Sequence, residues 1–259
     1  MKTTAHESQP LSSIQNMARS LNLTVLASAL PDVLSSAEQQ SIAYSDLVAR
    51  LLKAEINARQ ERRVTRILKR AKLGTVEELE TFDFSIRPKL EPRIIKELCT
   101  CQFVAEKRNV LCLGRPGLGK TRIAKIIGQA ACLAGYSVLF VNTAAMLENL
   151  ASSLVDGSYL RTLRRYTKPQ ALICDEFGYE SFDSKATKHL FRLVSARHRQ
   201  GSIVLTSNTG FKHWKALFPS EAAAVCTVDR LVDRATILRF TGQGCRNPKD
   251  AFGANLEDD

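Results

Sequence analysis

One run of eight residues constrains the fold of this chain more than any other feature. It matches the pattern G-x-x-x-x-G-K-[ST] at every fixed position and reads Gly114, Arg115, Pro116, Gly117, Leu118, Gly119, Lys120 and Thr121. The preceding run, 109–113, is apolar and strand-like, and residues 122–134 carry apolar side chains at helical spacing. A strand, a glycine-rich turn and a helix in this order predict a loop whose backbone N–H groups bind phosphate at a helix N-terminus.

The pattern also predicts roles for individual side chains. Lys120 is placed to reach the β- and γ-phosphates of a nucleoside triphosphate, and the hydroxyl of Thr121 to ligate Mg²⁺. The expected nucleotide contacts are the loop itself and the residue that follows it, Arg122. A chance glycine-rich turn is the alternative, and the acidic residues described below argue against it.

The composition sets limits on the class of protein. Of the 259 residues, 44% are hydrophobic and 24% are charged, which is ordinary for a chain with a sizeable core. No apolar stretch approaches the roughly 20 residues that cross a membrane, and the N-terminus lacks the apolar core of a signal peptide. The seven cysteines are scattered without metal-ligand spacing, as is typical of free thiols in a reducing compartment. We therefore expect a cytoplasmic protein without a membrane partner.

The net charge of +11 indicates a second partner. A nucleotide site does not require such an excess, so we expect contact with a polyanion, with charge that serves only solubility as the alternative. A predicted helix over 44–73 concentrates much of this charge on its polar side. The candidate DNA contacts are the basic residues of that side, Arg59, Arg62, Arg63, Arg66, Lys69 and Arg70.

The apolar pattern divides the chain. Residues 1–80 predict a small, basic, all-helical domain, with a helix over 11–30 that ends near Pro31 and the longer helix over 44–73. Residues 81–95 predict a linker whose segment Phe82-Asp83-Phe84 docks its aromatic rings on a neighbouring surface. Residues 96–247 predict the nucleotide-binding domain, and 248–259 a disordered tail.

In the nucleotide-binding domain, strand and helix patterns alternate. Strands are expected at 110–113, 137–141, 170–174, 202–206 and 236–240, and helices at about 120–134, 143–154, 158–166, 183–200 and 220–233. This alternation predicts an α/β fold, a parallel sheet with helices on both faces.

Two of these strands end in polar side chains that suit a nucleotide site. Because the carboxyl ends of parallel strands line the ligand crevice, Asp175 and Glu176 should lie beside the phosphates. Asp175 is placed to hold Mg²⁺, and Glu176 to orient and deprotonate the attacking water. Asn208 is expected to hydrogen-bond the γ-phosphate or that water, with Thr206 and Ser207 as neighbours that cap the strand. An acidic pair that merely opens a loop is the alternative, but downstream of a phosphate loop it favours hydrolysis.

Two arginines near the end of the chain, Arg230 and Arg234, could act on the nucleotide of a neighbouring subunit. An arginine supplied in this way stabilises the charge that develops during phosphoryl transfer. Taken without further information, the segment is more simply a solvated helix face of aspartates and arginines.

Together the motifs resemble the AAA+ ATPases and, within them, the IstB family of transposition helper proteins, relatives of the bacterial helicase loader DnaC. The resemblance covers about residues 10–247 and includes the aromatic linker, the phosphate loop, the acidic pair and the segments 205–208 and 228–231. It closes at 242–246, where Gly-Cys stands in place of the family's Ser-Tyr before Arg246.

The resemblance implies that Lys120 and Thr121 are Walker A residues, that Asp175 and Glu176 are the Walker B pair, and that Asn208 is sensor 1.

Towards the C-terminus it implies that Arg230 is the arginine finger and Arg246 a sensor-2-like arginine. Arg234, expected one helical turn beyond Arg230, competes for the finger role.

The function that the resemblance implies is an ATPase, with ATP and Mg²⁺ as cofactors, that forms homo-oligomers on duplex DNA without sequence preference. It would recruit the transposase of the same insertion element and hydrolyse ATP to disassemble. The first alternative is a helicase loader of the DnaC type, which the basic helix and the aromatic linker disfavour. A P-loop kinase would need an acceptor site for which no residues stand out, and a non-hydrolysing binding module conflicts with the intact Lys120, Asp175 and Glu176.

Overall fold

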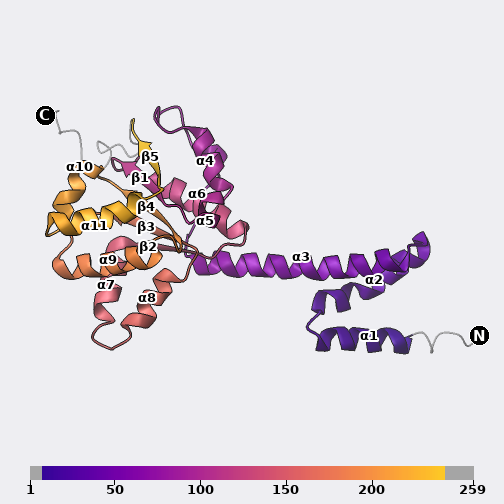
Figure 1. Ribbon diagram of the computed structural model, residues 1–259. Coiled ribbons are helices and arrows are strands. Elements are labelled where there is room, and N and C mark those ends of the chain that lie inside the picture. Colours follow the sequence, from indigo (N-terminus) through magenta and orange to yellow (C-terminus); the bar gives the residue numbers. More distant parts are fainter. Residues whose placement is uncertain (1–7, 243–259) are drawn as a thin grey trace, which may run out of the picture. The chain divides into compact units, whose positions relative to one another are not determined.

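The computed structural model describes residues 8–242, and Figure 1 shows the course of the chain. Its α-helices are α1 (Ser8–Ser20), α2 (Thr24–Gln40), α3 (Tyr44–Ala71), α4 (Pro92–Cys99), α5 (Gln102–Ala105), α6 (Lys120–Leu133), α7 (Thr143–Ser152), α8 (Tyr159–Thr167), α9 (Ser184–Arg197), α10 (Phe211–Trp214) and α11 (Glu221–Val232). Its strands are β1 (Val110–Gly114), β2 (Val138–Asn142), β3 (Ala171–Phe177), β4 (Ser202–Ser207) and β5 (Thr236–Phe240). Short 3₁₀ helices lie at Leu79–Thr81 and Lys215–Leu217. Over the described residues, no helix combines the length and apolarity that a membrane span needs.

The strands form one parallel sheet in the order β2-β3-β4-β1-β5. Strand β1 lies between β4 and β5, so Val110 is opposite Val204 on one side and Thr236 on the other. Parallel neighbours need crossover connections, which the intervening helices supply. The α/β class and the strands predicted from the apolar runs are confirmed.

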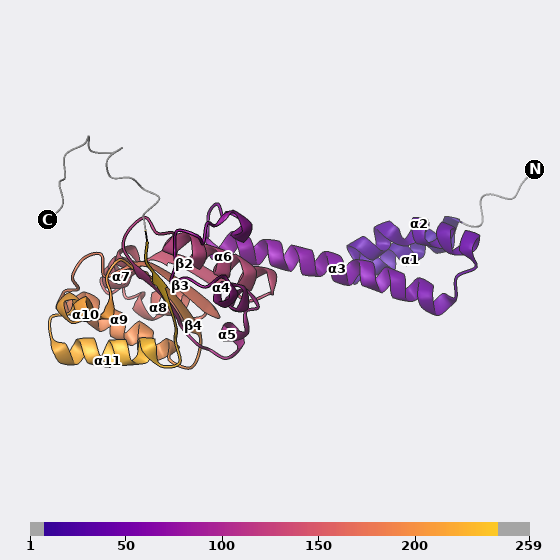
Figure 2. The same cartoon turned by 90° about the horizontal axis from the view of Figure 1, so that it is seen from above.

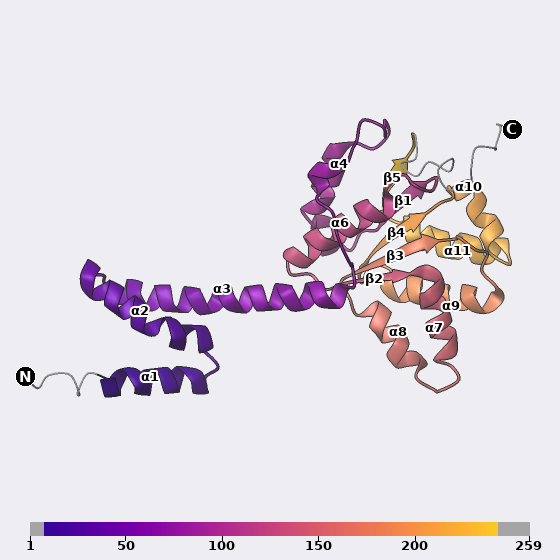
Figure 3. The ribbon, with the colours of Figure 1, turned by 180° about the vertical axis from the view of Figure 1, so that it is seen from behind.

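Helices cover both faces of this sheet (Figures 1 and 3). Helices α4, α5 and α6 pack on one face, together with strand residues such as Val110 and Cys112. Helices α7, α8, α9 and α11 pack on the other face, with the intervening residues Leu111 and Leu113. Figure 2 shows the same two layers from above. Because successive strand side chains point to opposite faces, a sheet buried on both sides requires strands without a polar face.

The contacts between residues divide the chain into two compact units, 1–66 and 67–259. In the first unit, the buried carboxylate of Glu55 on α3 accepts hydrogen bonds from the N–H groups of Val25 and Leu26, at 2.8 and 3.1 Å. These N–H groups lie in the first turn of α2 and have no partner within that helix. Glu55 therefore holds α2 and α3 together.

The predicted single helix over 11–30 is wrong, because the chain turns between α1 and α2, and α2 continues through Pro31. Proline cannot donate the hydrogen bond that would reach the carbonyl of Ala27. The side-chain amide of Gln15, on α1, donates to that carbonyl at 2.9 Å instead. A contact from a neighbouring helix thus satisfies the group that proline leaves without a donor.

The second unit begins inside α3. Ala71 and Leu73 are buried in the core beside α6, with Ile67 and Leu68 packed against them, so the division lies nearer the N-terminus than residue 80. Helix α3 ends at Ala71, close to the predicted end. Two short helices that the sequence analysis did not predict, α4 and α5, follow the linker and pack against α6 and the sheet.

Candidate nucleotide-binding site

The predicted phosphate loop lies between the end of β1 and the start of α6. Gly119, just before the helix, has φ +87°, and a Cβ there would lie 2.7 Å from the ring of Phe82. At Gly114 a Cβ would lie 2.1 Å from the carbonyl oxygen of Phe240, the last residue of β5. Both positions therefore require glycine for reasons of packing and backbone conformation. The loop is closely packed between β5 and the linker.

Lys120 is buried at the first position of α6, with only 6% of its surface exposed. Its amine donates to the backbone carbonyl of Arg115, within the loop, at 2.6 Å. Burial lowers the pKa of Lys120 to about 8, because the charged amine loses hydration. The amine is thus turned into the concave side of the loop.

Three side chains from three elements meet next to this lysine. The hydroxyls of Thr121 on α6 and Thr206 on β4 both donate to Oδ1 of Asp175 on β3, at 2.8 and 2.5 Å. Asp175 is buried, and its carboxylate is a hard oxygen donor beside the Thr121 hydroxyl. These are the ligand types that Mg²⁺ takes from a protein when phosphates and waters complete its shell. The bond from Thr206, on the neighbouring strand, holds the carboxylate in one orientation.

Glu176 lies at an irregularity of the sheet. The register between β3 and β4 shifts after Cys174, and Glu176 adopts φ +58°, which is uncommon for a residue with a side chain. Its N–H donates to the hydroxyl of Thr206 at 3.0 Å, and its side chain is exposed. The bulge turns the carboxylate out of the sheet, and Glu176 lines the cavity at the carboxyl ends of the strands.

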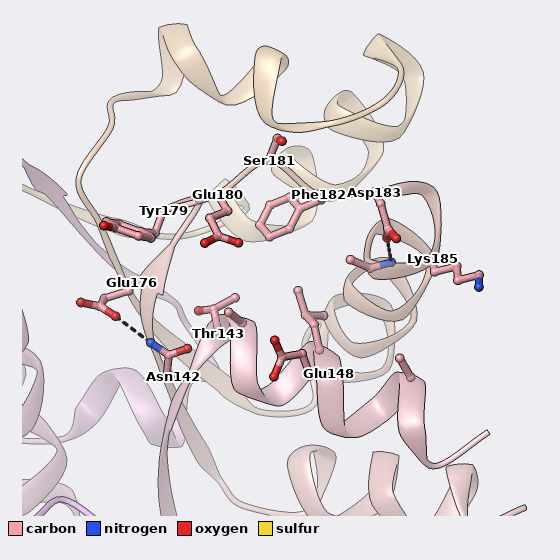
Figure 4. Close-up of a pocket in the computed structure, with 15 residues that line it drawn as sticks. Asn142, Thr143, Glu148, Glu176, Tyr179, Glu180, Ser181, Phe182, Asp183 and Lys185 are labelled. Carbon is pink, nitrogen blue, oxygen red and sulfur yellow. Dashed lines mark hydrogen bonds between the residues drawn. The ribbon is translucent and has the colours of Figure 1, made fainter. Parts of the chain in front are cut away.

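The carboxylate of Glu176 has a partner that the sequence analysis did not identify. The amide of Asn142, the last residue of β2, donates to Glu176 Oε2 at 2.7 Å (Figure 4). The carbonyl oxygen of the same amide accepts the N–H of Ala145 at 3.2 Å and caps the N-terminus of α7. The available sequence signal was an asparagine between a predicted strand and a predicted helix, beside the strand that ends in the acidic pair.

A cavity of about 860 Å³ joins these groups. Among its lining residues are the predicted site residues Pro116, Gly117, Gly119, Lys120, Thr121, Arg122, Glu176 and Asn208. Asn208 lies just beyond β4 and also lines a second cavity with Gly114, Arg115 and Leu118. Asp175 lies beneath the first cavity, bonded to Thr121. The structure therefore brings the loop, the acidic pair and Asn208 to one end of the sheet.

The linker forms another wall of this cavity. Arg87 is buried, and its guanidinium donates to the carbonyl of Leu118 at 2.7 Å and to that of Asp83 at 2.5 Å. The same guanidinium lies 4.5 Å from the centre of the Phe82 ring. The expected docking of the linker aromatics is thus observed for Phe82, and the surface they meet is the phosphate loop itself.

Arg122 faces the segment between α3 and the linker. Its guanidinium pairs with Glu77 at 2.8 Å and donates to the carbonyl of Glu78 and the hydroxyl of Thr81. Together with Arg87, it ties both flanks of the linker to the loop.

The structure separates the candidate C-terminal arginines from this cavity. Arg230 lies near the end of α11, donates to the carbonyl of Cys226 at 2.9 Å and stacks on Phe191 at 4.7 Å. Arg234 is not one helical turn beyond it on the same helix, because α11 ends at Val232 and Arg234 adopts φ +56°. Neither side chain lines the cavity of Lys120. Arg246 lies outside the described residues.

The candidate DNA contacts on α3 are less uniform than their sequence pattern. Arg59 and Arg62 pair with the buried Glu55 at 3.0 and 3.3 Å, so their charge is partly neutralised. Arg66 donates to the carbonyl of Arg62, Arg63 also has an interaction partner, and Lys69 and Arg70 are exposed.

The chain matches known proteins over most of its length. The family described as IstB-like ATP binding protein matches residues 16–251. A protein of Geobacillus stearothermophilus, named for ATP binding and for the insertion sequence IS5376, is 34% identical over 90% of this chain and 93% of its own length. A protein of Pseudomonas aeruginosa, named likewise for IS21, is 32% identical over 87% of this chain and 85% of its own.

Solved structures share the fold at lower identity. The crystal structure of DnaI has a TM-score of 0.54 at 19% identity, covering 65% of this chain and 92% of that chain. Domain III of the Thermotoga maritima replication initiation protein DnaA has a TM-score of 0.50 at 18% identity, covering 64% and 69%. With a family match over residues 16–251 and relatives above 30% identity, the chain belongs to the family of IstB-like ATP-binding proteins.

Proposed function

We propose that this protein is an ATPase that acts in DNA transposition. The observation that carries the proposal is the convergence of Lys120, the Thr121–Asp175 pair and Glu176 on one cavity at the carboxyl end of the sheet. A nucleoside triphosphate with its phosphates on the loop would exchange the bond between Lys120 and the Arg115 carbonyl for contacts to phosphate oxygens.

Thr121 and Asp175 are the residues that would hold Mg²⁺. When bound, the ion would offset the charge of the phosphates. Thr206 fixes Asp175 in place, so the carboxylate is oriented before the ion arrives.

Glu176 is the residue that we assign as general base. Its carboxylate projects from the bulge into the same cavity as Lys120 and Asn208. A base must come within hydrogen-bond distance of the attacking water. The bond from Asn142 occupies one carboxylate oxygen, so release or redirection of Glu176 becomes a point at which hydrolysis can be controlled.

Arg230 is proposed to act on the nucleotide of a neighbouring subunit. It does not line the cavity of its own chain, so it would reach a nucleotide only across an interface. Its present contacts, with Phe191 and the Cys226 carbonyl, can be exchanged without breaking a buried ion pair. Hydrolysis would then require assembly into a homo-oligomer.

The partners follow from charge and from the relatives. Relatives are named for insertion sequences, and this supports our proposal that duplex DNA and the transposase of the same element are the partners. A net charge of +11 favours binding through phosphates, without sequence preference and with strong dependence on salt. ATP would drive assembly on DNA, and hydrolysis would release the protein from the DNA.

The likeness to DnaI shows the fold alone and gives the helicase-loader alternative no further support.

The test is the rate of ATP hydrolysis against protein concentration, with random-sequence duplex DNA, with single-stranded DNA and without DNA, at two salt concentrations. We expect the rate per subunit to rise with protein, to be stimulated by duplex more than by single strands, and to lose this stimulation at high salt. A rate that is independent of protein and DNA would contradict the proposal, and stimulation by single strands alone would favour the helicase loader.

A further inference from the structure

The last turn of α11 carries Arg230, and a buried side chain from outside the helix holds this turn. The side chain is that of Asn109, which directly precedes β1 and is 7% exposed. Its amide nitrogen donates to the backbone carbonyls of Leu231 and Arg230, at 3.0 and 3.4 Å. The last carbonyls of a helix have no donor within the helix, so they need one from elsewhere. Asn109 therefore fixes the backbone of Arg230 itself.

Asn109 is also bonded to the sheet on both sides of β1. Its Oδ1 accepts the N–H of Ile203 in β4 at 2.9 Å. Its backbone carbonyl accepts the N–H of Thr236, the first residue of β5, at 2.9 Å. The end of α11 is thus tied to three adjacent strands, at their amino ends. The nucleotide cavity lies at the carboxyl ends of the same sheet, so Arg230 is held at the far end from the cavity of its own chain.

The side chain of Arg230 depends on this backbone position, because its aromatic partner lies on another helix. Its guanidinium carbon lies 4.7 Å from the centre of the Phe191 ring, on α9. Phe191 is half-buried and, within residues 8–242, belongs to neither cluster of the hydrophobic core. The contact is therefore not a consequence of core packing. A shift of α11 relative to α9 would move the guanidinium off the ring.

A second contact reaches the end of α11 from α9. Asp233, which follows the helix, accepts a bond from Nε of Arg199 at 3.0 Å, and Nε2 of His198 lies 2.8 Å from the same oxygen. These contacts lower the pKa of Asp233. All three side chains are partly exposed, and exposed ion pairs contribute little. We therefore expect the buried amide of Asn109 to be the stronger constraint.

We propose that Asn109 is a positioning residue for hydrolysis in the neighbouring subunit. It holds the last turn of α11 against the sheet, so that the guanidinium of Arg230 is presented at a defined place to the nucleotide of the next copy. The inference rests on the proposed action of Arg230 in trans and adds a residue on which that action depends. A misplacement of about 1 Å in a group that acts on the reaction can lower a rate by about 100-fold. Asn109 is not among the residues that line the cavity of Lys120, so its replacement should leave ATP binding there intact.

The experiment uses mixtures of two full-length variants, with ATP, Mg²⁺ and duplex DNA. In the reference mixture, Lys120→Ala protein supplies the arginine and Arg230→Ala protein supplies the nucleotide site. Asn109→Asp is then added either to the chain that supplies the arginine or to the chain that supplies the site. Aspartate keeps the acceptor for the N–H of Ile203 but lacks the N–H groups that hold α11. Asn109→Ala is the second variant, because it introduces no buried charge.

The matched control is Ser202→Ala, placed in the same two chains. Ser202 lies next to Ile203, is buried, and donates to the carbonyl of Phe103 at 3.1 Å. Its replacement removes one buried hydrogen bond from the same part of the sheet without removing a bond to α11. Melting temperatures and ATP affinities are measured for every protein.

We expect hydrolysis to fall by about 10- to 100-fold when the Asn109 variant supplies the arginine, and to stay within about twofold of the reference when it supplies the site. The control should show no such difference between the two mixtures. Equal losses in both mixtures, with or without lower melting temperatures, would show a general structural role and overturn the proposal, and so would full activity in both. A reference mixture without recovery would instead refute the action of Arg230 in trans, and the role of Asn109 would be refuted with it.

Discussion

The amide of Asn142 bonds to the carboxylate of Glu176 and to the first turn of α7 at once. One side chain at the end of β2 therefore connects the proposed catalytic base with the N-terminus of α7. We expect a displacement of α7 to change the position of the Glu176 carboxylate through this side chain.

Replacement of Asn142 should raise hydrolysis in the absence of DNA. Asn142→Ser retains a capping oxygen for α7 but is too short to hold the Glu176 carboxylate. We expect its DNA-free ATPase rate to exceed that of the wild type and its stimulation by duplex to shrink. Asn142→Ala should behave alike and lose about 1 kcal/mol of stability with the cap. Unchanged basal rates in both variants would show that the bond does not restrain Glu176.

Glu176→Gln should separate binding from hydrolysis. The amide keeps the size of the side chain but cannot accept a proton, so hydrolysis should fall by about 10²- to 10⁴-fold. ATP binding should persist, and the assembled protein should remain trapped on duplex DNA. Turnover and the dissociation rate from labelled duplex are the measurements, and normal turnover with fast release would refute the assignment.

An arginine that acts across an interface predicts complementation. Arg230→Ala protein should lose hydrolysis, and Lys120→Ala protein should lose ATP binding. A mixture of the two should recover part of the activity, because each supplies the group that the other lacks. Arg234→Ala serves as the control and should retain activity, since Arg234 lies beyond the end of α11. Absence of recovery in the mixture would argue against action in trans.

The pKa of Lys120, about 8, predicts proton uptake when a nucleotide binds. The negative phosphates should raise this pKa, so at pH 8 roughly half a proton should enter with each ATP. Affinity should weaken by up to about fivefold between pH 8 and pH 9, because the protonated fraction of Lys120 falls from about one half to about one tenth. Calorimetry in two buffers of different ionisation enthalpy measures the uptake.

The lowered pKa of Lys120 also makes the stability of the protein depend on pH. The unfolded lysine, with its ordinary pKa of 10.5, binds more protons than the folded one between pH 8 and pH 10.5. This group alone therefore makes unfolding less favourable as the pH rises through that window. Lys120→Met, the control for the stability measurement, should abolish this contribution.

Replacement of the buried Arg197 should cost the protein much of its stability. Its guanidinium is 1% exposed and donates to the backbone carbonyls of Tyr166, Thr167, Pro169, Gln170 and Ser202. Arg197→Met should destabilise the protein by about 3 kcal/mol, because these acceptors lose their donors. The neighbouring exposed residue provides the control, and Arg199→Met should leave the melting temperature unchanged within error. Equal melting temperatures for both variants would contradict this role.

The sequence predicts the second unit well because buried parallel strands leave a strong pattern. Residues 110–113 and 171–174 are apolar without alternation, and the turns between elements carry glycine and polar residues. The first turn of α6 and the strand ends could be located in this way, and with them Lys120, Thr121 and Asp175.

Features that depend on contacts distant in sequence could not be predicted. Helix α2 continues through Pro31, where Gln15 of α1 donates to the carbonyl that proline leaves without a donor. The sequence near Pro31 does not predict this bond between two helices. The outward turn of Glu176 follows from the bulge between Cys174 and Phe177, which exists only relative to β4. Arg87 joins the linker to the loop in the same manner, by a bond between residues far apart in the chain.

The bond between the Lys120 amine and the Arg115 carbonyl orients the lysine side chain before any ligand binds. An ammonium group has three N–H donors, and this bond uses one of them, so the amine can bind phosphate oxygens while it still contacts the loop. A nucleotide would therefore meet a side chain that has already lost most of its conformational freedom, and the entropy lost on binding would be smaller than for a mobile lysine.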